Sequence, residues 1–367
     1  MEKFAFIIHP IDARRDVARK GGIYSVAKYL PERAVESLIK FKEPIVASHI
    51  TGVKSTLGTE AEGWFIACPL TPRQLLTLPD DFVVKRLTQC GKLAASLGAK
   101  IIGLGAFTSV AGDGGVSVAR NLDIAVTTGN SYTVATAVEG AIDGARRMGT
   151  PLDTAKVAIV GATGSIGRTC AHLLANRVGE LSLVGRDIGR LERVAEELDG
   201  PCVTMSSDVR SGLRDAAVVI TVTSAVDAVI LPEHLATGAV VCDVARPRDV
   251  SVRVARERDD VLVIEGGVVS VPGDDVDFHF NFGFEPKTAY ACMSETMALA
   301  LEGRYESFTL GKDVSVEQVS EITGIARKHG FKLAGYRSFE KAVSEEQIRI
   351  IRRNADERRA ASGRKAA

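Results

Sequence analysis

The chain has 367 residues, of which 46% are hydrophobic and 25% are charged, a composition typical of a globular protein long enough for two domains. Lysine plus arginine equals aspartate plus glutamate at 46 each, so no overall charge favours nucleic acid or a membrane surface. No segment approaches the roughly 18 apolar residues of a membrane span, and the start lacks a signal-peptide pattern. We therefore expect a cytoplasmic protein with no nucleic-acid partner and no integral membrane segment.

The six cysteines are scattered, with no C-x-x-C pair and no histidine at metal-ligand spacing. This spacing indicates neither a disulfide framework nor a metal site.

The first part of the chain alternates strand-like and helix-like segments. Short apolar runs at 4–8, 45–50, 64–68 and 100–104 predict strands, and the helical spacing of apolar residues over 82–97 ends at Gly98. We expect an α/β substrate and catalytic domain over residues 1–150, including a linking helix over 132–147.

Two loops of this domain carry small hydroxyl and amide side chains. Phe107, Thr108 and Ser109 follow a predicted strand, and Asn130 lies just before the linking helix. These four residues are predicted to bind a substrate. Turn formation and helix capping explain the same residue types equally well at this stage.

The segment 156–167, KVAIVGATGSIG, is an apolar strand that runs into a glycine-spaced turn and a helix start. Gly161 allows the turn, Gly164 leaves room for a pyrophosphate, and Gly167 lets the helix pack closely. Thr163, Ser165 and Ile166 complete the predicted phosphate loop. The spacing is G-x-x-G-x-x-G rather than G-x-G-x-x-G, so the motif is weak without its context.

That context is a series of buried-type strands at 181–184, 218–222, 239–244 and 261–264, which alternate with helices. The alternation predicts a Rossmann-type, doubly wound parallel sheet over residues 151–285. Thr223, Ser224 and Gly267 follow two of these strands and are predicted to contact the cofactor.

Arg186 and Asp187 follow the second of these strands, where the cofactor ribose is recognised. An acidic residue at this place is typical of NAD sites and an arginine of NADP sites. Because Arg186 directly follows the strand-end glycine and Asp187 is placed to cap the next helix, we predict NADPH as the cofactor.

Pro286 and Gly303 bracket a predicted helix in the last segment, 286–367. Cys292 falls near the second turn of this helix, where a thiol has a lowered pKa and is a better nucleophile. The alternative is that Cys292 belongs to a buried stripe of small and apolar residues.

Five motifs in order carry a family resemblance: VAIVGATGSIG, GLGAFTS, TTGNSYT, EGGVV and AYACMSETMALALEG, followed by Arg327–Phe331. Although the phosphate loop comes later in the chain than GLGAFTS and TTGNSYT, the set as a whole resembles the long-chain acyl-(acyl-carrier-protein) reductase family best known from cyanobacteria. The resemblance covers most of the chain from about His9 to Phe331.

The resemblance implies NADPH-dependent reduction of a fatty acyl thioester to a fatty aldehyde through an acyl intermediate on Cys292. The acyl donor would be an acyl-carrier protein or acyl-CoA. His9, at a strand end matched in the family, would be an acid or hydrogen-bond donor; a histidine that caps a strand or faces solvent is the alternative. The 107–109 loop and Asn130 would stabilise the oxyanion.

The chain departs from the family pattern over residues 270–285 and in an extension of about 36 residues after Phe331. Residues 344–360 are predicted to form a charged helix with a capping box, interpreted as a solvated helix and tail rather than a docking element. Alternatives for the whole chain are a shikimate-dehydrogenase-like or glutamyl-tRNA-reductase-like enzyme, the latter with Cys68 as its only strand-end candidate, or a non-catalytic NADPH-binding sensor.

Overall fold

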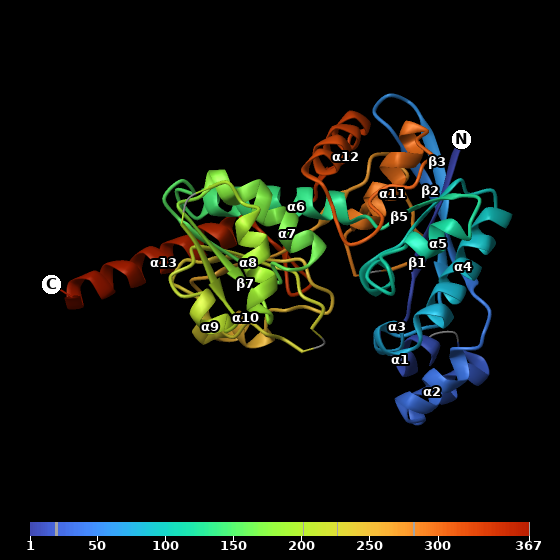
Figure 1. The fold of residues 1–367 in the computed structure, drawn as a ribbon, viewed down its shortest axis with the longest axis horizontal. Helices are drawn as coiled ribbons and strands as arrows, with labels where there is room; N and C mark the ends of the chain where they lie inside the picture. Colours follow the sequence, from blue (N-terminus) through green and yellow to red (C-terminus); the bar gives the residue numbers. More distant parts are fainter. Residues whose placement is uncertain (19–20, 201, 226, 282, 367) are drawn as a thin grey trace. The chain divides into compact units, whose positions relative to one another are not determined.

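The structure is a computed structural model that describes residues 1–18, 21–200, 202–225, 227–281 and 283–366. It contains two compact units, coloured along the sequence in Figure 1. Unit 1 comprises Met1–Gly129, Ser270–Asp313 and Ile322–Lys332, and unit 2 comprises Asn130–Val269, Val314–Glu321 and Leu333–Ala367. The three-segment division expected from the sequence stays a prediction.

Unit 1 is built on a five-stranded mixed sheet in the order β2-β3-β1-β4-β5. Its strands are β1 (Glu2–Ile8), β2 (Ile45–Lys54), β3 (Glu60–Ala67), β4 (Ile101–Gly103) and β5 (Ala125–Thr127). β2 is antiparallel to β3, and the other neighbours are parallel. The carboxyl ends of β1, β3, β4 and β5 therefore lie at one edge of the sheet.

Helices cover both faces of this sheet. On one face, α4 (Asp80–Ser96) buries Val83, Leu87 and Cys90 against the Ala5 and Ile7 side of β1. On the other face, α11 (Ala291–Glu302) lies on the side of Phe6, because Thr296 of α11 and Phe6 both lie against Gly103. The remaining elements of unit 1 are α1 (Ala13–Ala18), η1 (Gly22–Tyr29), α2 (Glu32–Ile39), α3 (Pro72–Thr77), η2 (Ala106–Ser109), α5 (Val116–Arg120) and β13 (Thr288–Tyr290).

Unit 2 contains a six-stranded parallel sheet in the order β11-β10-β9-β6-β7-β8. Its strands are β6 (Lys156–Val160), β7 (Glu180–Val184), β8 (Cys202–Ser206), β9 (Val218–Thr221), β10 (Val240–Asp243) and β11 (Leu262–Glu265). Counted from β6 this is the order 3-2-1-4-5-6 of dinucleotide-binding folds, whose order reverses between the first and fourth strands. The predicted doubly wound parallel sheet is confirmed.

Alternate residues of β10 face opposite layers of unit 2. Val240 packs against Gly144 of α6 (Asn130–Arg147), whereas Val241 belongs to a core cluster with Val254 of α10 (Val252–Glu257). The other helices of unit 2 are α7 (Ser165–Leu174), η3 (Ala175–Arg177), α8 (Ile188–Glu196), α9 (Val209–Gly212), η4 (Pro232–His234) and α13 (Glu345–Ala366).

The remaining elements are β12 (Val268–Ser270), β14 (Lys332–Leu333), β15 (Tyr336–Ser338), β16 (Lys341–Val343) and α12 (Val316–His329), which is shared between the units at Ile322. No described helix has the length and apolarity needed to cross a membrane.

The structure corrects the start of the cysteine helix. Residues 288–290 form strand β13, and α11 begins at Ala291 rather than at Pro286. Lys287 has a φ of 61°, which is incompatible with a continuous right-handed helix. Cys292 is therefore in the first turn of its helix, closer to the amino end than the sequence predicted.

The structure also corrects the interpretation of the C-terminal helix as a solvated element. Ser344 and Gln347 form the predicted capping box, but Ala355 of α13 is fully buried. Arg358 pairs with the buried carboxylate of Asp260 at 2.6 Å. Basic side chains that could have attracted an acidic partner are thus used to hold α13 within unit 2.

Candidate active site

In unit 1, Cys292 lies at the beginning of α11, directly after the N-cap residue Tyr290 and Ala291. Its side chain is half-buried. The amide groups of a helix's first turn have no intrahelical partner, and they favour a negative charge at this end of the helix. This placement suits a thiolate nucleophile.

Three glycines make room for the amino-terminal part of α11. A Cβ at Gly129, whose φ is 76°, would lie 2.3 Å from the Cα of Cys292. A Cβ at Gly105 would lie 3.3 Å from the Cys292 Sγ, and one at Gly103 would lie 2.1 Å from the Thr296 Oγ1. The helix can therefore sit directly on the backbone at the ends of β4 and β5 only because these positions lack side chains.

A buried carboxylate fixes the next turn of α11. Glu295 is fully buried and accepts hydrogen bonds from the hydroxyls of Thr127 and Thr309, the latter at 2.7 Å. The neighbouring Thr128 hydroxyl donates to the Thr309 carbonyl at 2.5 Å. Glu295 thus joins the helix to β5 and to the chain that follows α11, a role that the sequence did not reveal.

The predicted substrate loop lies at the same sheet edge. Phe107, Thr108 and Ser109 form η2 after β4. The Thr108 hydroxyl accepts from the Gly105 amide and donates to the Gly105 carbonyl, and the Ser109 hydroxyl donates to Ala106 at 2.7 Å. These two side chains form the turn, as in the alternative considered from the sequence.

His9 follows β1 and lies beside this loop, with its ring 6.1 Å from that of Phe107. Its Nδ1 is 3.3 Å from the Pro10 carbonyl oxygen, so Nδ1 carries a proton and donates. Burial lowers the pKa of His9 below its usual value, which favours the neutral ring near pH 7. The free Nε2 of that tautomer is a proton acceptor rather than the acid that we expected.

In unit 2, the glycine loop lies between β6 and α7 at the position where the strand order reverses. A Cβ at Gly161 would lie 2.5 Å from the Val222 carbonyl oxygen, and one at Gly167 would lie 2.3 Å from the Gly161 carbonyl oxygen. Gly164 is the N-cap of α7 and provides no side-chain cap. The amides of Ser165, Ile166 and Gly167 therefore form a cradle that fits a pyrophosphate.

Asn130, predicted to bind substrate, lies in unit 2 and donates from Nδ2 to the Ser165 Oγ at 3.4 Å. The structure thus places Asn130 beside the phosphate loop, whereas Phe107, Thr108, Ser109, His9 and Cys292 belong to unit 1.

At the end of β7, the side chain of Asp187 accepts from the Arg190 amide at 3.1 Å and caps α8. Arg186 is exposed. The Arg190 guanidinium donates to the carbonyl of Thr163 in the phosphate loop at 3.3 Å. The helix-capping role foreseen for Asp187 is confirmed.

The loop after β9 is held by a second buried carboxylate. Asp249 accepts from the Thr221 hydroxyl at 2.6 Å, and from the amide and hydroxyl of Thr223 at 2.9 and 2.5 Å. Ser224 follows directly. The Thr223 side chain therefore supports the loop, and its hydroxyl is engaged by Asp249.

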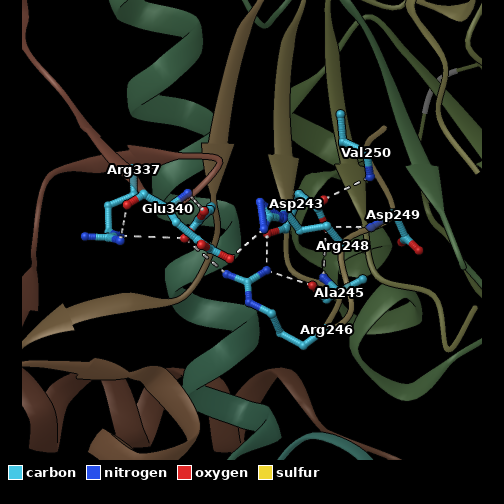
Figure 2. A network of polar contacts seen from close by, with 9 residues as sticks. Asp243, Ala245, Arg246, Arg248, Asp249, Val250, Arg337 and Glu340 are labelled. Carbon is cyan, nitrogen blue, oxygen red and sulfur yellow. Dashed lines mark hydrogen bonds and ion pairs between the residues drawn. The ribbon is translucent and has the colours of Figure 1, made fainter. Parts of the chain in front are cut away.

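Asp243, at the end of β10, holds the loop that contains Asp249, as Figure 2 shows. Its carboxylate accepts from the amides of Ala245 and Val250 at 3.1 and 3.0 Å. Burial raises the pKa of Asp243 to about 6, although the positive charge of Arg246 opposes the rise.

Glu265, at the end of β11, lies 3.6 and 3.7 Å from the guanidinium groups of Arg246 and Arg337. It also accepts from the Glu340 amide at 2.6 Å, and Arg337 and Glu340 appear on one side of Figure 2. Gly267 follows with a φ of 79°. The hairpin of β15 and β16 is thereby fixed to this sheet edge.

These supporting carboxylates were not predicted. Asp243, Asp249 and Glu295 are each fully buried, and a buried acid needs hydrogen-bond donors. Asp243 ends a buried apolar strand and Glu295 lies within an apolar helix, so an acidic residue in an apolar run was the available signal.

Comparison with known proteins gives one family match and two distant relatives. Residues 143–265 match the shikimate/quinate 5-dehydrogenase family. The chain is 28% identical over 363 residues to the aminotransferase PigE of Serratia sp., covering 96% of this chain but only 42% of PigE. It is 26% identical over 344 residues to the long-chain acyl-[acyl-carrier-protein] reductase of Synechococcus elongatus, covering 88% and 95% of the two chains.

Solved structures with a similar course include a putative malic enzyme, at 14% identity and a TM-score of 0.44 over 96% of this chain and 84% of that one. L-tryptophan dehydrogenase from Nostoc punctiforme has 12% identity and a TM-score of 0.43 over 96% and 88%. These scores describe only a loose similarity of fold. The sequence matches are those of an NAD(P)-dependent oxidoreductase with an NAD(P)H-binding Rossmann domain.

Proposed function

We propose that this protein reduces a long-chain fatty acyl thioester to the fatty aldehyde, with NADPH as reductant and Cys292 as nucleophile. The observation that carries the proposal is the placement of Cys292 in the first turn of α11, packed against Gly105 and Gly129. The 26% identity with an acyl-[acyl-carrier-protein] reductase along nearly all of that protein supports the substrate class.

The Cys292 thiolate attacks the carbonyl carbon of the thioester, and the bond from that carbon to the donor's sulfur breaks. The donor thiolate leaves and takes up a proton, while the acyl group stays on Cys292. Reduction of this acyl carbon then releases the aldehyde and regenerates the Cys292 thiolate. The net reaction consumes one acyl thioester, one NADPH and one proton, and it yields aldehyde, NADP⁺ and the free thiol.

NADPH would supply the hydride for the second step. We assign its pyrophosphate to the amides of 165–167, its 2′-phosphate to Arg186, and its nicotinamide side to the strand ends near Ser224 and Gly267. The glycine cradle fits this role because side chains at Gly161 and Gly167 would collide with neighbouring backbone.

We assign oxyanion stabilisation to backbone amides rather than to the Thr108 and Ser109 hydroxyls, which hydrogen-bond within their own turn. In the described part of unit 1, the amides of Ala106 and Phe107 have no hydrogen-bond acceptor. Together with the first amides of α11 they are candidates for the oxyanion formed at each step. Neutral His9 would accept a proton through Nε2.

The test compares wild-type protein with Cys292→Ala and Cys202→Ala, using long-chain acyl-carrier protein, acyl-CoA and NADPH. Cys202 is exposed and lies in unit 2, so its substitution controls for loss of a thiol. We expect Cys292→Ala to form no aldehyde while still binding NADPH, and wild type without NADPH to gain the mass of one acyl group on Cys292. Aldehyde formation by Cys292→Ala at the wild-type rate would refute the proposal.

The alternatives predict other outcomes of the same assay. A sensor would bind NADPH without oxidising it. A glutamyl-tRNA-reductase-like enzyme would need Cys68 as nucleophile, but Cys68 is fully buried, and no feature of its surroundings favours attack on a substrate.

A further inference from the structure

Arg86 in unit 1 is a buried cation whose hydrogen-bonding groups are only partly used. It lies on α4, and its side chain is 6% exposed. The Nη1 atom donates to the Gln89 Oε1 at 2.6 Å. Among the described residues, neither Nε nor Nη2 has a hydrogen-bond partner.

The nearest carboxylate does not neutralise this charge. Glu43 Oε1 is 3.9 Å from Nη1, beyond hydrogen-bond distance, and its side chain is 73% exposed. A guanidinium removed from water without a close anion carries a large desolvation penalty. Native proteins meet such a penalty with a partner or a ligand.

The two unused atoms define the shape of the missing partner. Nε and Nη2 form one edge of the planar guanidinium, and their N–H bonds point in parallel toward the same side. This edge matches two oxygens of a phosphate or a carboxylate, bound in a bidentate manner. From this geometry we propose that Arg86 is the centre of an oxyanion-binding site, which takes a phosphate or carboxylate group through its Nε and Nη2 edge.

The position of Arg86 relates this site to the carboxyl edge of the unit 1 sheet. Arg86 lies one turn before Cys90 on α4, and a hydrogen bond with Cys68, followed by burial, raises the pKa of Cys90. The Cys68 amide donates to the Ile8 carbonyl at 2.8 Å, where β3 and β1 end. A ligand with its anionic group at Arg86 would thus approach the edge that also carries His9 and η2.

The experiment uses the full chain in chloride buffer with saturating NADP⁺, so that the phosphate loop of unit 2 is filled. Inorganic phosphate is titrated at constant ionic strength, and binding is measured by calorimetry and by the rise in Tm. Wild type should bind phosphate. Arg86→Met should lose binding, and Arg86→Lys should lose at least tenfold because a lysine has no such edge.

Two further variants sharpen the test. Glu43→Gln should bind phosphate several-fold more tightly, because it removes the nearest negative charge. Lys85→Gln, which removes an exposed charge from the neighbouring position on α4, should bind like wild type. In chloride buffer alone, Arg86→Met should have a Tm equal to or above that of wild type, because the buried charge is then unpaired.

The outcomes separate the alternatives. Equal phosphate binding by wild type and Arg86→Met, no anion binding by wild type, or a lower Tm of Arg86→Met without anions would each overturn the proposal, the last two by giving Arg86 a structural or water-bonded role. Acetate and CoA form the other arms. Preference for acetate identifies a carboxylate ligand, and tighter binding of CoA than of phosphate, lost in Arg86→Met, identifies the phosphate of a thioester donor. These results do not depend on aldehyde formation.

Discussion

The carboxyl edges of the two sheets are built in different ways. In unit 2 the phosphate cradle is one continuous segment, in which Gly161 and Gly167 contact each other across a single turn. In unit 1 the surroundings of Cys292 come from separate parts of the chain: the end of β1, the turn after β4, the end of β5 and the start of α11. A local loop depends on its own backbone, whereas an assembled edge depends on packing between distant segments.

This difference predicts where each edge is vulnerable. The unit 1 edge should be most sensitive to groups that separate α11 from β4 and β5. The unit 2 edge should depend on the buried carboxylates that hold its loops. Substitutions that leave every proposed site residue in place can test both statements.

The largest effect is expected for Gly129→Ala. The new Cβ would lie 2.3 Å from the Cys292 Cα, and the φ of 76° disfavours any side chain. Overpacking and the left-handed backbone together should cost about 4 kcal/mol of unfolding free energy, and the displaced Cys292 should lose activity. Urea denaturation and aldehyde formation measure the two effects.

Gly58→Ala is the matched control for Gly129→Ala. Its φ is 90°, but no atom lies within 4 Å of the position of the new Cβ. It should show only the backbone cost, roughly 1 kcal/mol, with activity unchanged. Equal losses in the two variants would mean that packing against Cys292 contributes nothing.

The contrast between the edges also explains what the sequence could predict. The parallel sheet of unit 2 and its glycine loop follow from local patterns: buried strands of four or five residues alternate with helices, and the glycines are close in sequence. Asp187 could be assigned as a cap because capping is decided within four residues. Strand β8 was missed because Cys202–Ser206 is a partly exposed edge strand with little apolar pattern.

Unit 1 was less accessible to sequence reasoning. Cys292 could be singled out, but its contacts with Gly105 and Gly129 depend on how α11 packs on the sheet. The start of α11 was placed too early because Pro286 is a typical first helical residue, while the strand at 288–290 is only three residues long. Buried partners such as Thr127 and Glu295 have no local signal of their pairing.

The second prediction concerns the loops of unit 2. The pKa of Asp243 is about 6 in the folded protein, above the ordinary value of 3.8. The folded state therefore holds this proton more tightly, and the resulting stabilisation is fully present below about pH 3.8 and lost as pH rises through 6. By linkage the loss is about 3 kcal/mol.

Asp243→Asn should remove this dependence, so that unfolding free energies at pH 5 and 7.5 differ less than in wild type. Asp153→Asn, at an exposed position, controls for the loss of one negative charge. An unchanged pH dependence in Asp243→Asn would show that the buried carboxylate does not titrate in this range.

A smaller effect is expected for Thr127→Val in unit 1. The variant deprives the buried Glu295 carboxylate of one donor, which should cost about 2 kcal/mol and lower kcat by loosening the first turns of α11. Thr88→Val is its control, because the buried Thr88 hydroxyl has no hydrogen-bond partner in the described chain. Thr88→Val should be neutral or slightly stabilising, and equal destabilisation by both variants would contradict the anchoring role of Glu295.

The smallest effect is expected for Arg186→Ala, which tests the nucleotide preference of unit 2. Asp187 uses Oδ1 to cap α8, so it is poorly placed to bind a ribose 2′-hydroxyl, whereas the exposed Arg186 can reach a 2′-phosphate. Loss of this pair should weaken NADPH relative to NADH about tenfold, or 1.4 kcal/mol. Asp187→Ala should lose about 1 kcal/mol of stability through the missing cap with the NADPH to NADH affinity ratio unchanged. A changed ratio in Asp187→Ala together with an unchanged one in Arg186→Ala would reverse the assignment and make Asp187 the ribose ligand of an NAD site.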